Sequence, residues 1–250
     1  MTSATAISFG FAAGDVVIVT GAGSGIGRAT SIHAAELGLA VAAWDLNPDT
    51  VRQTVATIEA AGGKGVACTA DVGDDAQVTA ALARSAAAVG EARYLVNNAG
   101  PASASAMEFD RALALCVGSV RRVTEAWLAR GKHDGAALVN VASVAGNIIG
   151  TQPDWYGAAK AGIMGYTRHL AAYRTDDVRS NAVAPGMTDT PRLAGFTASD
   201  VGQRVLARMP LHRLASPDEI AWAILYLLSP LASYIHGVLL PVDGGWTIAQ

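Results

Sequence analysis

The stretch DWYGAAKAG, residues 154–162, places a phenol and an ammonium group four residues apart among small side chains. Residues at this spacing share one face of a helix, so the Lys160 ammonium can approach the Tyr156 hydroxyl. A free phenol has a pKa of about 10 and becomes a useful base near neutral pH only when a neighbouring cation stabilises the phenolate. The pair is therefore either an acid/base centre or a chance pairing on a helix surface, because tyrosine and lysine often occur at this spacing.

A second candidate site is the glycine-rich stretch TGAGSGIGR, residues 20–28. Its glycines, Gly21, Gly25 and Gly27, form the pattern G-x-x-x-G-x-G and not the stricter G-x-G-x-x-G fingerprint. The stretch follows an apolar run and opens a helical pattern, so its backbone could approach a diphosphate at the positive end of a helix dipole. A flexible loop between a strand and a helix is the alternative.

Asp45 strengthens the nucleotide interpretation, because it ends the next apolar run about 20 residues further on. A carboxylate at that position can accept hydrogen bonds from an adenosine ribose. It also repels a 2′-phosphate, and the residue that follows is Leu46 and not a basic residue. The pattern therefore favours NAD over NADP, although Asp45 could also be a simple turn former.

Short apolar runs alternate with longer helical patterns along the whole chain. Strands are expected over 16–20, 39–45, 65–71, 94–98, 136–143, 178–185 and 237–245. Helices are expected over 25–38, 48–61, 74–89, 108–130, around Tyr156 and over 217–228. This alternation predicts an α/β fold: one doubly wound Rossmann domain over 14–250, with a seven-stranded parallel sheet and helices on both faces. Residues 1–13 are expected to form a loose tail.

The composition excludes several classes of function. The 250 residues are 51% apolar and 16% charged, with a net charge of −3, which argues against a nucleic acid or an acidic membrane as partner. Neither a signal peptide nor a membrane helix is indicated, so a soluble, cytoplasmic protein is expected. Two cysteines and five scattered histidines lack metal-ligand spacing, so no metal site is expected.

Five motifs in order resemble those of the short-chain dehydrogenase/reductase family. They are TGAGSGIGR (20–28), NNAG (97–100), YGAAK (156–160), NAVAPG (181–186) and VDGGW (242–246). The match covers nearly the whole chain after residue 14. The resemblance implies an NAD-dependent alcohol dehydrogenase or ketoreductase that is a homotetramer and acts on a small-molecule alcohol or ketone.

The resemblance also implies a role for particular residues. Tyr156 would exchange the proton of a secondary alcohol while hydride passes to or from NAD(H), Lys160 would stabilise the phenolate, and Ser143 would hold the substrate oxygen. The cofactor would be contacted by Gly21, Ser24, Gly25, Ile26, Gly27, Asp45, Leu46, Asp71, Val72, Asn98, Ala99, Gly100, Tyr156, Lys160, Pro185, Gly186, Thr188 and Thr190. The substrate would be contacted by Ser143, Ile149, Trp155, Met187, Leu193 and Phe196.

The chain departs from the family pattern at two places. Cys116, in LALCV, occupies the position of an asparagine whose backbone carbonyl holds a water that links the active-site lysine to solvent in the family. A thiol is a poor substitute for an amide, so the proton relay could be weakened or rerouted. The segment 101–107 is shorter than in many relatives, at the expected mouth of the active site. These departures leave a second hypothesis open, a catalytically weak NAD-binding protein.

Overall fold

The computed structural model describes residues 9–131 and 134–249 of the chain, and its centre is a seven-stranded parallel sheet. The strands are β1 (Val16–Thr20), β2 (Ala40–Asp45), β3 (Gly65–Thr69), β4 (Ala92–Asn97), β5 (Ala137–Val141), β6 (Arg179–Pro185) and β7 (Leu239–Val242). They lie in the order β3-β2-β1-β4-β5-β6-β7, and every neighbouring pair is parallel. The predicted doubly wound sheet is confirmed. Its order reverses between β1 and β4, so a crevice for a ligand is expected there, beyond the carboxyl ends of these strands.

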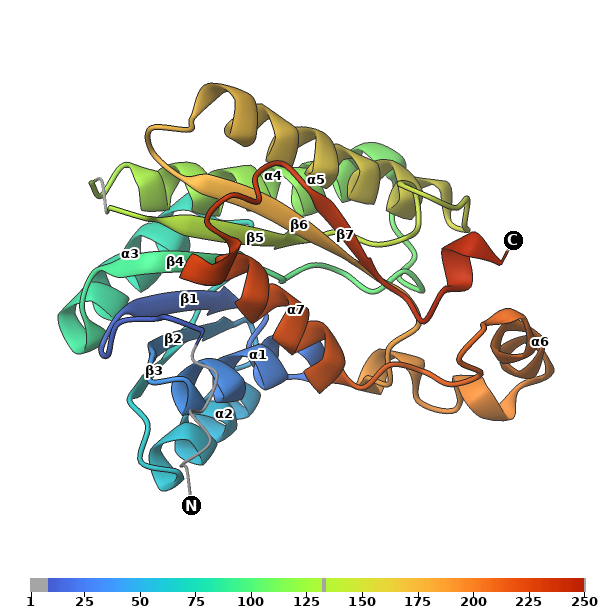
Figure 1. Cartoon of the computed structure of the whole chain (residues 1–250), viewed down its shortest axis with the longest axis horizontal. Coiled ribbons are helices and arrows are strands. Elements are labelled where there is room, and N and C mark those ends of the chain that lie inside the picture. Colours follow the sequence, from blue (N-terminus) through green and yellow to red (C-terminus); the bar gives the residue numbers. More distant parts are fainter. Residues whose placement is uncertain (1–8, 132–133, 250) are drawn as a thin grey trace, which may run out of the picture.

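Helices cover both faces of the sheet (Figure 1). They are α1 (Gly25–Glu36), α2 (Pro48–Ala60), α3 (Asp75–Val89), α4 (Phe109–Leu128), α5 (Asp154–Tyr173), α6 (Asp200–Arg208) and α7 (Pro217–Leu228). One core joins α1, α2 and α7 to the sheet, and the core on the opposite face joins α3, α4 and α5 to it. The central strands are buried on both faces, as the unbroken apolar run VVIVT of β1 predicts.

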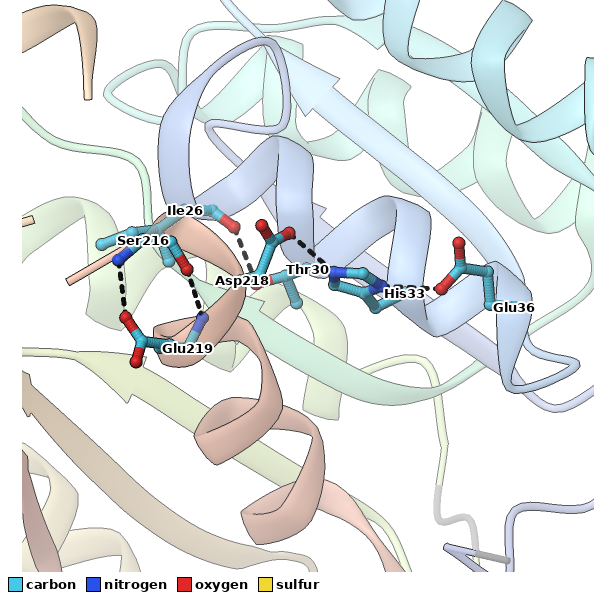
Figure 2. Close-up of polar contacts among 7 residues, drawn as sticks. All are labelled: Ile26, Thr30, His33, Glu36, Ser216, Asp218 and Glu219. Atoms are coloured by element: carbon cyan, nitrogen blue, oxygen red, sulfur yellow. Dashed lines mark hydrogen bonds and ion pairs between the residues drawn. The ribbon is translucent and has the colours of Figure 1, made fainter. Parts of the chain in front are cut away.

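Helix α1 is packed against α7, and a polar cluster fastens the two helices at their surface (Figure 2). The two ring nitrogens of His33 each lie 2.7 Å from a carboxylate oxygen, one of Glu36 and one of Asp218. Asp218 belongs to the first turn of α7, where Ser216 and Glu219 cap the helix reciprocally. These contacts link α1 to the first turn of α7, and the N-terminus of α1 forms part of the site described below.

Two features differ from the sequence prediction. Residues 9–13 were assigned to a loose tail, but the rings of Phe9 and Trp222 stack at 6.0 Å, and Phe11 packs edge-on against Tyr94 at 5.2 Å. These ring contacts attach residues 9–11 to the domain, whereas residues 1–8 lie outside the described part of the chain. Helix α6 was not predicted at all, and in Figure 1 it projects from the body of the domain.

No helix within the described ranges is long and apolar enough to cross a membrane.

Candidate functional site

A cavity of about 640 Å³ opens at the carboxyl edge of the sheet, where the strand order reverses. Its size is typical of small-molecule and cofactor sites. Two halves can be distinguished. The nucleotide half is lined by the β1–α1 turn and by residues at the ends of β2, β3 and β4. The substrate half is lined by Val144, Ala145, Ile149, Thr151, Met187, Leu193 and Trp246. Ser143, Tyr156 and Lys160 line the same cavity.

The β1–α1 turn depends on close backbone packing. A Cβ atom on Gly27 would lie 2.1 Å from the Gly21 carbonyl oxygen, a distance that no real side chain tolerates. Asn98 fastens the turn to β4, because its side-chain amide donates to the carbonyl oxygens of Thr20 and Gly21. The Thr20 hydroxyl in turn accepts the backbone N–H groups of Asn98 and Ala99. The turn is therefore held rigidly at the point where the strand order reverses.

The N-terminus of α1 is suited to a phosphate. Its N-cap residue, Ser24, makes no side-chain capping hydrogen bond, and the first turn of the helix contains no acidic residue. The N-cap side chains of α2, α3, α6 and α7 cap their helices, whereas those of α4 and α5, like that of α1, do not. The first N–H groups of α1 lack such a partner and face the cavity through Ser24, Gly25 and Ile26, so a diphosphate can supply the missing acceptors.

Asp45 ends β2 beside this turn. One of its carboxylate oxygens accepts from the Gly23 N–H at 2.8 Å, and the other accepts from the Asn47 N–H at 2.9 Å. These bonds fix the carboxylate at the cavity wall and leave it free to accept further hydrogen bonds. Asp71 lies beyond β3 on the same wall, and its side chain accepts from the Gly73 N–H. The nucleotide half therefore has two carboxylates at its far end.

The acid/base pair lies in the first two turns of α5. Lys160 donates from its Nζ to the Val141 carbonyl oxygen at 2.8 Å, and the same Nζ lies 5.7 Å from the centroid of the Tyr156 ring. The lysine therefore bridges the end of β5 and the helix that carries the tyrosine. Ser143, two residues beyond β5, is almost buried, and its hydroxyl accepts the Ala145 N–H at 3.1 Å.

Two contacts that the sequence did not predict align Ser143 with Tyr156. Gly146, at φ +77°, lies so close to α5 that a Cβ would stand 1.9 Å from the Gly157 carbonyl oxygen. The Asn147 side-chain amide donates to the Ser143 carbonyl oxygen at 3.1 Å and to the Lys160 carbonyl oxygen at 3.0 Å. The serine segment and the tyrosine helix are thereby joined as one unit. Only the small residues of the stretch VAGN hinted at this contact in the sequence.

Most residues predicted for the site line the cavity. For the nucleotide they are Gly21, Ser24, Gly25, Ile26, Asp45, Leu46, Asp71, Val72, Asn98, Ala99, Gly100, Pro185, Gly186, Thr188 and Thr190. For catalysis and substrate they are Ser143, Tyr156, Lys160, Ile149, Met187 and Leu193. Gly27 is a packing residue behind the turn and does not line the cavity.

Trp155 and Phe196, predicted to contact substrate, are not placed at the cavity. Trp155 is 2% exposed and packs with Ala112, Cys116 and Ala159, because adjacent residues of a helix face directions about 100° apart and Tyr156 takes the cavity side. Phe196 belongs to a 3₁₀ turn (Phe196–Ala198) that leads into α6.

Cys116 also lies in that cluster, away from the cavity wall. Helix α4 runs without interruption past it, and the Cys116 carbonyl oxygen accepts from the Ser119 hydroxyl at 3.3 Å. Burial raises the pKa of the Cys116 thiol, and the nearby Lys160 charge offsets this only in part. The thiol is therefore a buried apolar group and not a nucleophile.

Several lining residues were not predicted. They are Leu115, Ser119, Thr151, Arg192 and Trp246. The segment 101–104, expected at the mouth of the active site, lines the cavity as well. The sequence offers no periodicity that marks these positions, because each lies on a connection or on a helix face chosen by packing. Within the described ranges, no group of three or more His, Cys, Asp or Glu residues could hold a metal ion.

Comparison with known proteins places this geometry in a family. The model of a family described as enoyl-(acyl carrier protein) reductase matches residues 21–247. The chain belongs to the short-chain dehydrogenase/reductase family. It is accordingly an oxidoreductase that uses a nicotinamide cofactor.

Relatives of known activity cover nearly the whole chain. The cis-4-hydroxycyclohexanecarboxylate dehydrogenase of Sinomonas cyclohexanicum is 40% identical, over 93% of this chain and 96% of that protein. A solved 7α-hydroxysteroid dehydrogenase, in complex with NADH and 7-oxo glycochenodeoxycholic acid, is 30% identical with a TM-score of 0.87, over 93% and 94% of the two chains. An actinorhodin polyketide ketoreductase with NADPH is 29% identical with a TM-score of 0.84, over 93% and 97%.

Proposed function

We propose that this protein is an NAD-dependent dehydrogenase that interconverts a largely apolar, cyclic secondary alcohol and its ketone. One observation carries the proposal: Ser143, Tyr156 and Lys160 line a single cavity with Asp45 and the uncapped N-terminus of α1. A cavity that combines an acid/base group with a binding site for a dinucleotide is suited to hydride transfer between the dinucleotide and an alcohol or ketone.

The chemistry assigns one role to each side chain. A bound nicotinamide supplies the hydride acceptor for oxidation or the hydride donor for reduction. Tyr156 takes the hydroxyl proton of the alcohol, or returns it to the ketone oxygen. Ser143 donates a hydrogen bond to the same oxygen and so orients it. Lys160 keeps its ammonium near the phenol through the bond to Val141 and stabilises the phenolate.

The preference for NAD rests on the adenosine end of the cavity. Asp45 and Asp71 line it, and Leu46, which is 68% exposed, occupies the position next to Asp45. A 2′-phosphate would meet two carboxylates there, whereas the ribose hydroxyls of NAD can donate to Asp45. Structural neighbours with NADH and with NADPH both exist, so the preference is derived from these side chains alone.

The preference for an apolar, cyclic substrate rests on the substrate half. Its lining includes Val144, Ile149, Met187, Leu193 and Trp246. Such a wall stabilises a hydrocarbon ring through burial of its apolar surface. The hydroxycyclohexane and steroid substrates named for two relatives are of this kind. The predicted homotetramer stays a prediction.

The test is Tyr156→Phe, with Tyr173→Phe as a control on the exposed end of the same helix. Oxidation of cyclic secondary alcohols and reduction of their ketones would be followed by NADH absorbance, and NADH binding by fluorescence titration. Loss of a positioned acid/base group should lower kcat/KM about 10²–10⁴-fold while NADH affinity stays nearly constant. Unchanged turnover in Tyr156→Phe would refute the assignment. Binding of NADH by the wild type without turnover of any ketone would support the weak binding protein instead.

A further inference from the structure

Arg192 is a cation in the cavity that the proposed reaction does not use. Within the described ranges, four charged side chains line the cavity: Asp45, Asp71, Lys160 and Arg192. Both carboxylates lie in the nucleotide half, and Lys160 is bound to Val141 beside the catalytic tyrosine. The lining residues of the glycine turn, Gly21, Ser24, Gly25 and Ile26, carry no charge, and Arg28 does not line the cavity. A dinucleotide diphosphate carries two negative charges, so Arg192 is the remaining cation that could offset them.

Two contacts place the segment 190–192 between the glycine turn and the residues that follow β4. Thr190, two residues earlier, lies against Gly25: a Cβ on Gly25 would be 3.0 Å from the Thr190 Cγ2. Arg192 itself donates from Nη2 to the Gly100 carbonyl oxygen at 2.6 Å. Gly100 follows Asn98 and Ala99, which contact Gly21 at the other end of the turn. Residues 190–192 therefore line the cavity between the N-terminus of α1 and Gly100.

The present partners of Arg192 are weak acceptors that can be exchanged. Among the residues that the structure describes, the guanidinium has one further hydrogen-bond partner besides Gly100, the Pro101 carbonyl oxygen at 3.5 Å. Both acceptors are neutral, and no acidic side chain in the described part of the chain pairs with Arg192. The residue is exposed on the 3₁₀ turn Pro191–Leu193, so its side chain can be redirected at little cost. A phosphate accepts two parallel hydrogen bonds from a guanidinium, and these are stronger than bonds to carbonyl oxygens.

We propose that Arg192 binds the diphosphate of the dinucleotide and closes the 190–193 segment over it. Arg192 exchanges at least one backbone carbonyl for a phosphate oxygen, and the cofactor is then held between the α1 N-terminus and this guanidinium. The proposal rests on the proposed function only in requiring a dinucleotide in this cavity. It makes Arg192 a positioning residue for the cofactor.

The experiment compares Arg192→Leu, Arg192→Lys and the control Arg204→Leu by calorimetric titration with ADP-ribose, NADH and adenosine. Arg204 is an exposed arginine of α6 that does not line the cavity. Arg192→Leu should weaken ADP-ribose and NADH binding about tenfold, the scale of one charge-assisted pair, and leave adenosine binding unchanged. Arg192→Lys should lower the affinity for ADP-ribose and NADH about threefold, because lysine keeps the positive charge but lacks the planar guanidinium that donates two parallel hydrogen bonds. Added salt should weaken ADP-ribose binding more in the wild type than in Arg192→Leu.

Four outcomes would overturn the proposal. Equal losses for adenosine and ADP-ribose would mean that Arg192 only supports the cavity wall. Affinities equal to those of Arg204→Leu would mean that it makes no contact with the nucleotide. Unchanged nucleotide affinity with a raised KM for a carboxylate-bearing alcohol alone would assign Arg192 to substrate. Failure of the wild type to bind ADP-ribose would remove the cofactor site as well. If ADP-ribose binding depends on Arg192 but no alcohol is oxidised, the proposed function fails and the diphosphate contact stands.

Discussion

The nucleotide half and the substrate half of the cavity are built in different ways. The nucleotide half is made by strand ends and by the first residues of α1, and its parts are fixed to one another by backbone contacts such as those of Asn98. The substrate half is made by connections, which are anchored at a few points. One anchor is the pairing of Thr188 with Ala215, just before α7. The side chains at strand ends can therefore be assigned to the cavity from the local sequence. Which side chains of a connection line the cavity depends instead on the helix face against which the connection packs.

The largest expected effect is that of Gly27→Ala in the nucleotide half. The new Cβ would collide with the Gly21 carbonyl oxygen and with the Asn98 amide, so the turn must move. We expect the free energy of unfolding to fall by about 1–3 kcal/mol and NADH affinity to fall at least about tenfold. Urea unfolding and NADH titration would measure this. Gly165→Ala, at an exposed helix position with no atom within 4 Å, is the control and should be neutral or slightly stabilising. Equal behaviour of the two variants would show that the turn is not rigid.

Two residues predicted to contact substrate should respond differently to substitution: Trp155, which is buried in the core, and Leu193, which lines the cavity. Trp155→Ala should lower the free energy of unfolding by about 3–5 kcal/mol, because it leaves a void beside Cys116 and Ala159. Leu193→Ala, at the cavity wall, should leave stability within about 1 kcal/mol and raise the KM of an apolar alcohol. Thermal unfolding and steady-state kinetics would show the contrast. If Trp155→Ala instead keeps its stability and only raises the KM of the alcohol, Trp155 contacts the substrate.

A smaller effect is expected for Glu219 in the first turn of α7, which follows the Thr188–Ala215 pairing. Hydrogen bonds from Arg213 and from the Ser216 N–H lower the pKa of Glu219 to about 2. Because the folded pKa lies below the unfolded value of about 4.3, this stabilisation is present above pH 4.3 and is lost as the pH falls through 2. Glu219→Gln should therefore destabilise the protein at pH 7, by no more than about 1 kcal/mol for an exposed pair, and the difference should shrink below pH 4. Urea unfolding at several pH values measures it, with Glu59→Gln on the exposed face of α2 as control. A difference that does not depend on pH would assign the effect to packing.

The sequence by itself determined the architecture and most of the nucleotide half. Alternating apolar runs and helical patterns predicted the parallel sheet, and in such a sheet the residues at carboxyl ends of strands meet at one edge. The glycine turn, Asp45 and Asn98 could be placed for that reason. The pair Tyr156 and Lys160 was also predictable, since the spacing of four residues on a helix is a local property.

Only the tertiary structure decided which side chains of the connections face the cavity. Trp155 is buried against α4 although its neighbour Tyr156 reaches the cavity, and no local pattern distinguishes the two. The contact between Gly146 and Gly157, like that between Arg192 and Gly100, joins segments 11 and 92 residues apart in the sequence. Such contacts depend on how close two backbones approach, and this distance is set by the packing of whole helices on the sheet.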